Sequence, residues 1–285
     1  MKRESSKTLI VGFFVILSGV VVITAGCKSK TDSKQDTKSK LSGSVRVGGS
    51  TTVLPIAQAA AEQFQAKNPD VKVEVQGTGS SEGIKGVTEG TLDIGDSSRE
   101  LKPKEKSLGL VDHAVAIDVI AFAVHPSNKV KNLTPDQIKG ILTGKIGNWK
   151  EVGGLDEKIQ VVGRDEASGT REYVQKEVIG KDAKFVQDAL ALPGTGQLKA
   201  AVAQTPFAFG YMSIGQVDDT VRAVKVDGVA PTPKSVESKD YKYQRNLHMF
   251  TKGEAKGATK AFIDFVLSKE FQSGTLSKEF YPITK

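Results

Sequence analysis

Short apolar runs alternate with amphipathic stretches from residue 45 to the C-terminus, and this alternation is typical of an α/β fold. Residues 71–75 alternate apolar and polar side chains as a strand does. A helix is expected over residues 55–67, because Pro55 suits a first helical turn. Further strands are expected at 45–47, 92–95, 159–162, 208–212, 221–226 and 247–250, and further helices at 82–89, 135–142, 170–179 and 258–271.

One apolar run is long enough to constrain the domain organisation. Only Asp118 interrupts the apolar residues 114–124, and a strand of this length could pass from one domain into another. We therefore expect two α/β lobes, the first made of residues 45–118 and 247–285 and the second of residues 119–246. A cleft between two such lobes is a natural place for a ligand.

The N-terminus has the pattern of a secretory signal. A positively charged start precedes 15 uncharged residues, 9–23, which are fewer than the ~20 that span a bilayer. We assign residues 1–26 to a signal peptide. Residues 24–27 resemble a bacterial lipobox, although Thr24 replaces the usual Leu, and we predict lipid attachment at Cys27. An ordinary signal peptide with a chance cysteine and an uncleaved anchor remain alternatives.

Residues 27–44 combine the cysteine with a polar stretch of Lys, Ser, Thr, Asp and Gln, which predicts a disordered tether. The first 44 residues hold 8 Lys/Arg and 3 Asp/Glu, which leaves 32 and 30 for the remainder. The basic character of the chain therefore belongs to its N-terminus, and the body shows no nucleic-acid footprint. Cys27 is the only cysteine, so no disulfide is expected.

Glycine and hydroxyl residues occur three times between an expected strand and an expected helix, at 49–52, 79–81 and 168–170. Helix starts offer unpaired N–H groups and a partial positive charge, so they suit an anion. One such loop alone is better explained as an ordinary helix cap. Three loops, together with Arg164 and its planar two-donor fork, favour an anion site.

These motifs resemble the phosphate-binding proteins of bacterial phosphate ABC transporters, over nearly the whole body. The matching segments are residues 49–52, 77–81, 93–98, 133–150 and 164–170. The resemblance implies a type II periplasmic-binding-protein fold, with two lobes joined by two crossing strands and the ligand buried between them. It also implies phosphate-binding roles for Thr51, Thr52, Ser80, Arg164, Ser168, Gly169 and Thr170, and we add Ser50, Ser98 and Asp118 as candidates.

The chain departs from this family pattern at Ser98, where well-known members have an aspartate that accepts a proton from the ligand and so excludes sulfate. We hypothesise that Asp118 supplies the missing acceptor, because a lone carboxylate in an apolar run needs a partner. The alternative is a carboxylate bonded to neighbouring backbone. The adjacent Arg99 either adds charge to the site or pairs with Asp96 or Glu100.

The expected function is capture of inorganic phosphate outside the cytoplasm for the membrane permease of an ABC importer, by a lipid-anchored monomer. No cofactor, no nucleic-acid partner and no enzymatic activity are expected, since His113, His125 and His248 lack metal-ligand spacing and Ser168 lacks a nucleophile elbow. The alternatives are a binder of sulfate or molybdate on the same fold, a phosphate-sensing or adhesive surface lipoprotein, and a phosphoester hydrolase.

Overall fold

The computed structural model describes residues 40–283, so the predicted signal peptide, Cys27 and most of the predicted tether lie outside it. Strand β1 begins at Gly43, two residues earlier than expected and inside the segment assigned to the tether. Within residues 40–283, no helix is long and apolar enough to cross a membrane.

A mixed sheet runs through the protein in the strand order β2-β1-β3-β11-β4-β8-β6-β7, with β9 beside β4. In one half, β1 pairs in parallel with β2 and β3, and in the other half β6 pairs in parallel with β7 and β8. The bounds are β1 (Gly43–Gly49), β2 (Val71–Gly77), β3 (Ile94–Ser97), β6 (Gln160–Arg164), β7 (Leu190–Leu192), β8 (Ala208–Ser213) and β9 (Arg222–Ala223), while β5 (Asn132–Leu133) and β10 (Lys225–Val226) form a separate pair.

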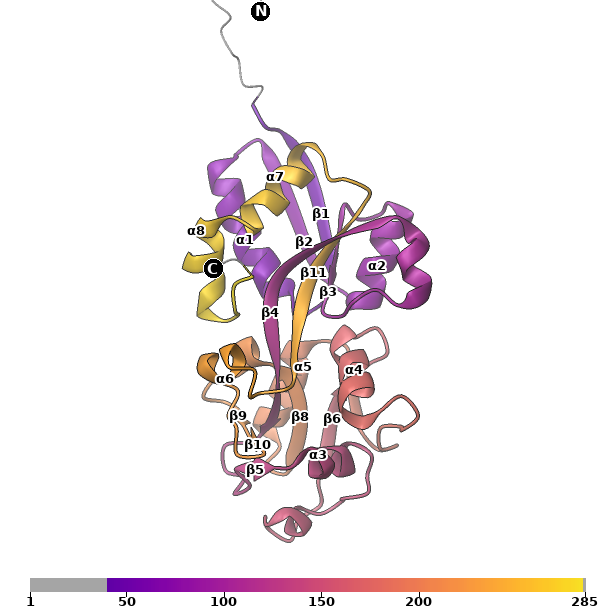
Figure 1. Cartoon of the computed structure of the whole chain (residues 1–285), viewed down its shortest axis with the longest axis vertical. Coiled ribbons are helices and arrows are strands. Elements are labelled where there is room, and N and C mark those ends of the chain that lie inside the picture. The colour runs from indigo at the N-terminus through magenta and orange to yellow at the C-terminus, as the bar shows by residue number, and fades with distance from the viewer. Residues whose placement is uncertain (1–39, 284–285) are drawn as a thin grey trace, which may run out of the picture. The chain divides into compact units, whose positions relative to one another are not determined.

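Two long antiparallel strands, β4 (Leu110–Val124) and β11 (Gln244–Lys252), run between the two halves (Figure 1). Strand β4 pairs with β11 as far as Val119 and with β8 from Ile120 onward. A bulge interrupts the register of β11 between Leu247 and His248. We call the part built on β1, β2 and β3 the first lobe, and the part built on β6, β7 and β8 the second lobe.

Helices cover both faces of the first-lobe sheet (Figure 1). On one face α1 (Leu54–Lys67), α7 (Gly257–Val266) and α8 (Lys269–Gly274) bury a core in which Phe64 and Phe262 meet edge to face at 5.5 Å. On the other face α2 (Ser80–Glu89) packs Ile84 and Val87 against Phe250. The 3-10 helices η1 (Pro103–Leu108) and η5 (Leu276–Lys278) complete this lobe.

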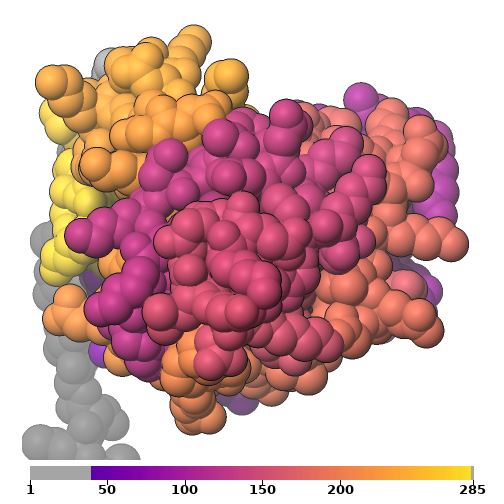
Figure 2. Space-filling view, turned by 90° about the horizontal axis from the view of Figure 1, so that it is seen from below, coloured from indigo at the N-terminus to yellow at the C-terminus, as the bar shows by residue number. Residues whose placement is uncertain are grey.

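The second lobe packs its short helices around β8 and β6. Trp149 is buried here and donates from its indole N–H to the Phe207 carbonyl at 2.9 Å, so it is a packing residue of this lobe. Figure 2 views the molecule from the second-lobe end, and α3 with the segment after it lies at the centre of that face. The helices are α3 (Pro135–Leu142), η2 (Trp149–Val152), α4 (Gly169–Val174), η3 (Gln175–Ile179), α5 (Thr195–Gln204), η4 (Ile214–Gln216) and α6 (Pro233–Glu237).

The long predicted elements match the structure well, while the short elements β5, β7 and α6 were not expected and three further differences have a physical reason. The helix expected at 258–271 is two helices, because the Ser268 side chain accepts from Phe271 N at 3.3 Å and caps a new start. The strand expected at 221–226 is split between β9 and β10, which pair with different strands. Helix α5 was not anticipated, since it buries only Thr195, Leu198 and Val202 and has a weak apolar face.

Candidate anion-binding site

The first of the three loops joins β1 to α1. A Cβ on Gly49, whose φ is +134°, would collide with the Asp96 carbonyl, so the close approach of this loop to β3 requires glycine. Ser50 N donates to that carbonyl at 2.9 Å. The Ser50 hydroxyl accepts from Thr52 N at 3.2 Å and from Val53 N at 3.4 Å. The Ser50 side chain therefore holds the turn that leads into α1, as an ordinary cap does.

The second loop brings Ser80, the first residue of α2, against Ser98, which follows β3. Their hydroxyl oxygens lie 3.2 Å apart, and Ser98 N donates to Ser80 Oγ at 3.1 Å. Both side chains are buried. The position where family members have an aspartate thus holds a neutral hydroxyl that can both donate and accept.

The third loop belongs to the second lobe and meets the other two. The Thr170 hydroxyl lies 3.1 Å from that of Thr52 and 3.4 Å from that of Ser98. Gly169 allows this approach, because a Cβ there would collide with Ser80 Oγ. Ser168 caps α4 by accepting from Arg171 N at 3.2 Å. Four buried hydroxyls from both lobes therefore come together, and we call Thr52, Ser80, Ser98 and Thr170 the hydroxyl cluster.

Arg164 ends β6 and is 2 % exposed. Its Nε donates to the Leu192 carbonyl at 3.1 Å, one terminal nitrogen to Thr195 Oγ1 at 2.9 Å, and the other to the Pro193 carbonyl at 2.8 Å. A guanidinium has five N–H donors, so one N–H remains on each terminal nitrogen. The side chain is held in place by three acceptors and keeps a two-donor fork for an oxyanion.

Thr195 was missed by the sequence analysis and connects Arg164 to the first loop. Its hydroxyl accepts from Arg164 and lies 3.0 Å from Thr51 Oγ1, while Thr195 N donates to Thr51 Oγ1 at 3.3 Å. Gly194 and Thr195 form a fourth glycine–hydroxyl helix start, at α5. The glycine–threonine pair at 194–195 is visible in the sequence, but it was not singled out because no strand was expected directly before it.

Asp118 is fully buried and lies beside Arg245, its register partner on β11. Its Oδ2 accepts from Arg245 Nε at 3.0 Å and from a terminal nitrogen at 2.8 Å, and its Oδ1 accepts from Ser213 Oγ at 2.5 Å. The alternative of a carboxylate bonded to neighbouring backbone is wrong, because both oxygens accept from side chains, while a role of Asp118 as an acceptor for the ligand stays a prediction. The other contacts of Arg245 extend to the Ser98 carbonyl at 2.9 Å and Thr170 Oγ1 at 3.0 Å.

The buried charges next to the hydroxyl cluster favour an anion. Arg164 and Arg245 are both buried, while Asp118 is the one carboxylate paired with them. Burial lowers the pKa of Arg164, the nearby charge of Arg245 lowers it further, and Asp165 opposes this shift. Two guanidiniums against one buried carboxylate leave a positive site that a bound oxyanion would balance.

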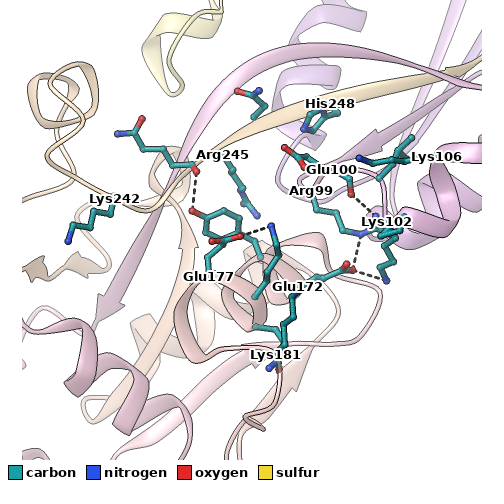
Figure 3. A pocket seen from close by; sticks show the side chains of 17 residues that line it. Arg99, Glu100, Lys102, Lys106, Glu172, Glu177, Lys181, Lys242, Arg245 and His248 are labelled. Carbon is teal, nitrogen blue, oxygen red and sulfur yellow. Dashed lines mark hydrogen bonds and ion pairs between the residues drawn. The ribbon is translucent and has the colours of Figure 1, made fainter.

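Arg99 does not make either of the ion pairs expected from the sequence. Its terminal nitrogens donate to the Glu105 carboxylate at 2.7 and 3.0 Å, and from Glu100 only the main-chain carbonyl accepts a bond from this side chain, at 2.9 Å. Its Nε lies 2.9 Å from Glu172 Oε2, and Lys102 Nζ lies at the same distance from that oxygen (Figure 3). Because Glu172 belongs to α4, these pairs join the two lobes.

Comparisons with known proteins give the family. The PBP superfamily domain matches residues 34–270. The phosphate-binding protein PstS of Bacillus subtilis (strain 168) is 36% identical over 280 residues, covering 95% of this chain and 93% of that protein. The PstS of Borreliella burgdorferi is 33% identical over 240 residues, covering 80% and 86% of the two chains.

Solved structures agree in fold. A phosphate ABC transporter substrate-binding protein from Clostridium perfringens, with bound phosphate, is 44% identical with a TM-score of 0.81, covering 85% of this chain and 100% of that one. An ABC-type phosphate transport receptor from Vibrio cholerae is 32% identical with a TM-score of 0.70, covering 84% and 100%. With its two α/β lobes and two crossing strands, the protein has the type II periplasmic-binding-protein fold. The chain therefore belongs to the PBP superfamily and, within it, to the PstS family of phosphate-binding proteins.

Proposed function

We propose that this protein binds one inorganic phosphate ion at the hydroxyl cluster and delivers it to an ABC-type importer. The observation that carries the proposal is the meeting of four buried hydroxyls, from loops of both lobes, beside two buried guanidiniums and one carboxylate. The names of the relatives support phosphate as the ligand. Binding, rather than catalysis, is the function that these relatives share.

The ligand contacts follow from the donors that remain. Arg164 offers its two remaining N–H groups, the hydroxyls of Thr51, Thr52 and Thr170 offer O–H donors, and the starts of α1 and α2 add partial positive charge. These contacts come from both lobes, so a bound phosphate would hold the lobes together. Exclusion of water from such a site strengthens each charge-assisted hydrogen bond.

Asp118 is proposed to act on the ligand through Arg245, which it fixes between Ser98 and Thr170. A protonated phosphate oxygen would then find its acceptor among the hydroxyls, with Ser98 in the position of the family aspartate. A neutral hydroxyl does not repel a sulfate dianion as a carboxylate does. We therefore expect sulfate to be rejected less strongly here than by a site with an aspartate.

The remaining assignments are proposals from the sequence. Cleavage of residues 1–26 and lipidation of Cys27 would place the domain outside the cytoplasm on a flexible tether that extends to about Gly43. The permease subunits of the importer would be its protein partners, and the monomer its working form. The exchange of partners on β4 between Val119 and Ile120 supports a lobe division close to residue 118.

Calorimetric titration tests the proposed ligand. Protein spanning residues 28–285, stripped of bound anions, is titrated with phosphate and then with sulfate. We expect one phosphate per chain with a Kd near or below micromolar, or about −8 kcal/mol and more favourable, and sulfate binding that is weaker but measurable. Tight sulfate binding without phosphate binding would move the assignment to another oxyanion. Absence of binding for both anions would refute the proposed function.

A further inference from the structure

A large cavity is lined by charged side chains from several segments (Figure 3), and one phosphate ion does not account for its size. It has a volume of about 750 Å³ and is lined by residues from the first lobe at 99–106, the second lobe at 172–181 and the chain around β11 at 242–248. We call it the outer pocket. Arg245 lines it and also donates to Thr170 of the hydroxyl cluster. Pockets of this volume hold molecules considerably larger than a single phosphate ion.

The outer pocket is strongly cationic. Seven Arg or Lys residues and His248 line it, against three glutamates. Four of these cations are paired with acids: Glu172 pairs with Arg99 and Lys102, Glu177 pairs with Lys176 at 2.7 Å, and Asp118 pairs with Arg245. Among residues 40–283, no ion pair joins an acid to the three remaining lysines, which are Lys106, Lys181 and Lys242.

The wall of the pocket contains buried polar groups that lack partners. His248 is 3 % exposed, its Nδ1 lies 2.7 Å from Asp112 Oδ1, and its Nε2 has no hydrogen-bond partner. Arg99 Nε is close to Glu172 but does not donate to it with hydrogen-bond geometry. A buried donor or acceptor without a partner is costly. A ligand that reaches this wall would find polar atoms whose hydrogen-bonding capacity is unused.

The chemistry of the lining selects the type of ligand. Leu101, Pro103 and Tyr173 contribute apolar or aromatic side chains to the lining, and the unpaired lysines come from three separate segments. Charge spread over three segments matches an extended anion with several phosphoryl groups better than a compact ion or an aromatic molecule. We propose that the outer pocket is a second binding site, for condensed phosphate of diphosphate length or longer.

The position of the pocket predicts coupling to the inner site. An anion in the pocket contacts both lobes and the crossing strand, so it stabilises the same closed arrangement that brings Thr52 and Thr170 together. Two ligands that favour one arrangement strengthen each other reciprocally. Condensed phosphate in the outer pocket therefore increases the affinity of the inner site for phosphate.

Titration of tripolyphosphate into protein already saturated with phosphate tests the proposal. The expected result is one further site, with phosphate bound about fivefold or more tightly when tripolyphosphate is present. Arg164→Ala, which alters only the inner site, keeps tripolyphosphate binding. Tripolyphosphate binding by this variant does not require bound phosphate. It therefore distinguishes failure of the proposed outer pocket from failure of the proposed phosphate-binding function. Competition between the two anions, or no tripolyphosphate binding, would overturn the inference.

Charge reversal locates the site. The triple variant K106E/K181E/K242E is expected to weaken tripolyphosphate binding at least tenfold while phosphate still binds. The matched control K129E/K145E/K225E makes the same charge change at exposed lysines outside the pocket and is expected to change the affinity less than twofold. Equal losses in the two triple variants would show that tripolyphosphate responds only to the net charge of the protein, which contradicts a defined site.

Discussion

Asp118 and Asp96 are both completely buried and flank the same crossing strand, but their surroundings are opposite. Asp118 accepts three hydrogen bonds, from Arg245 and Ser213. Asp96 lies on β3, and neither of its carboxylate oxygens has a hydrogen-bond partner. Burial raises the pKa of Asp96 well above its ordinary value, so the group escapes the cost of a buried charge by retaining a proton.

The difference shows that neither of these two buried carboxyl groups adds unbalanced negative charge to the site. Asp118 balances Arg245, and burial raises the pKa of Asp96 and so favours its neutral form, whereas the hydrogen-bond acceptors of Arg164 are only carbonyl and hydroxyl oxygens. Of the two buried guanidiniums beside the hydroxyl cluster, Arg245 is thus paired with a carboxylate and Arg164 is not. We expect the pair to support stability and the unpaired group to support ligand binding.

The largest expected effect comes from breaking the pair. Asp118→Ala leaves Arg245 buried without its carboxylate, which should lower the free energy of unfolding by about 3–5 kcal/mol. Urea unfolding of the two proteins measures the difference. Asp118→Asn keeps an acceptor for Ser213 or Arg245 and should lose less. A change below about 1 kcal/mol for the alanine variant would show that Arg245 finds water or another acceptor.

The next effect concerns affinity. Arg164→Ala removes the unpaired guanidinium, and phosphate binding should weaken by about 2–5 kcal/mol, as for loss of one partner of a buried charge-assisted bond. Calorimetry gives the value, and Arg46→Ala is the control, because Arg46 pairs with Asp93 on the outer part of the sheet. Retention of wild-type affinity in the Arg164 variant would place the ligand elsewhere.

The sequence predicted most of the fold because its elements are locally encoded. Alternation over residues 71–75 and the helix at 135–142 appear in the structure as β2 and α3. Thr52, Ser80 and Thr170 were foreseen as parts of one site because each stands at the beginning of a helix after glycine or beside it. The ordinary capping role foreseen as an alternative applies to the side chains of Ser50 and Ser168.

The parts of the site that were missed depend on register and long-range packing. Arg245 reaches Asp118 because the two are register partners on β11 and β4, although they are 127 positions apart in the chain, and pairing of this kind leaves no local signal. The two ion pairs considered for Arg99 were wrong, because it pairs instead with Glu105, six residues along the chain, and with Glu172 in the other lobe, and only the second of these pairs depends on long-range packing. The outer pocket forms only where three distant segments meet, so no single motif could indicate it.

A smaller effect is expected at Asp96. Asp96→Leu removes a buried polar group without partners and should raise the free energy of unfolding by about 1–3 kcal/mol at pH 7. The wild-type protein keeps this proton in the folded state to a higher pH than in the unfolded state. The contribution of the Asp96 carboxyl group to the free energy of unfolding is therefore fully present below the pKa of the unfolded state, and it is lost as the pH rises through the pKa of the folded state. The advantage of the leucine variant should accordingly grow with pH in unfolding experiments.

The smallest effect belongs to Asp93, a half-exposed carboxylate directly before β3 that is paired with Arg46. The hydrogen bond from Arg46 is the main cause that lowers the pKa of Asp93, and solvent screens the pair because the Arg46 side chain is 43% exposed. Asp93→Ala should lower the Tm by less than about 4 °C near neutral pH. A lowered pKa stabilises the folded state above the unfolded pKa, so the difference should shrink as the pH falls below about 4. The stability that Asp96 contributes falls as the pH rises, whereas the stability that Asp93 contributes falls as the pH falls. Thermal unfolding of the Asp96→Leu and Asp93→Ala variants across pH therefore separates the cost of burying a carboxylate from the benefit of pairing one.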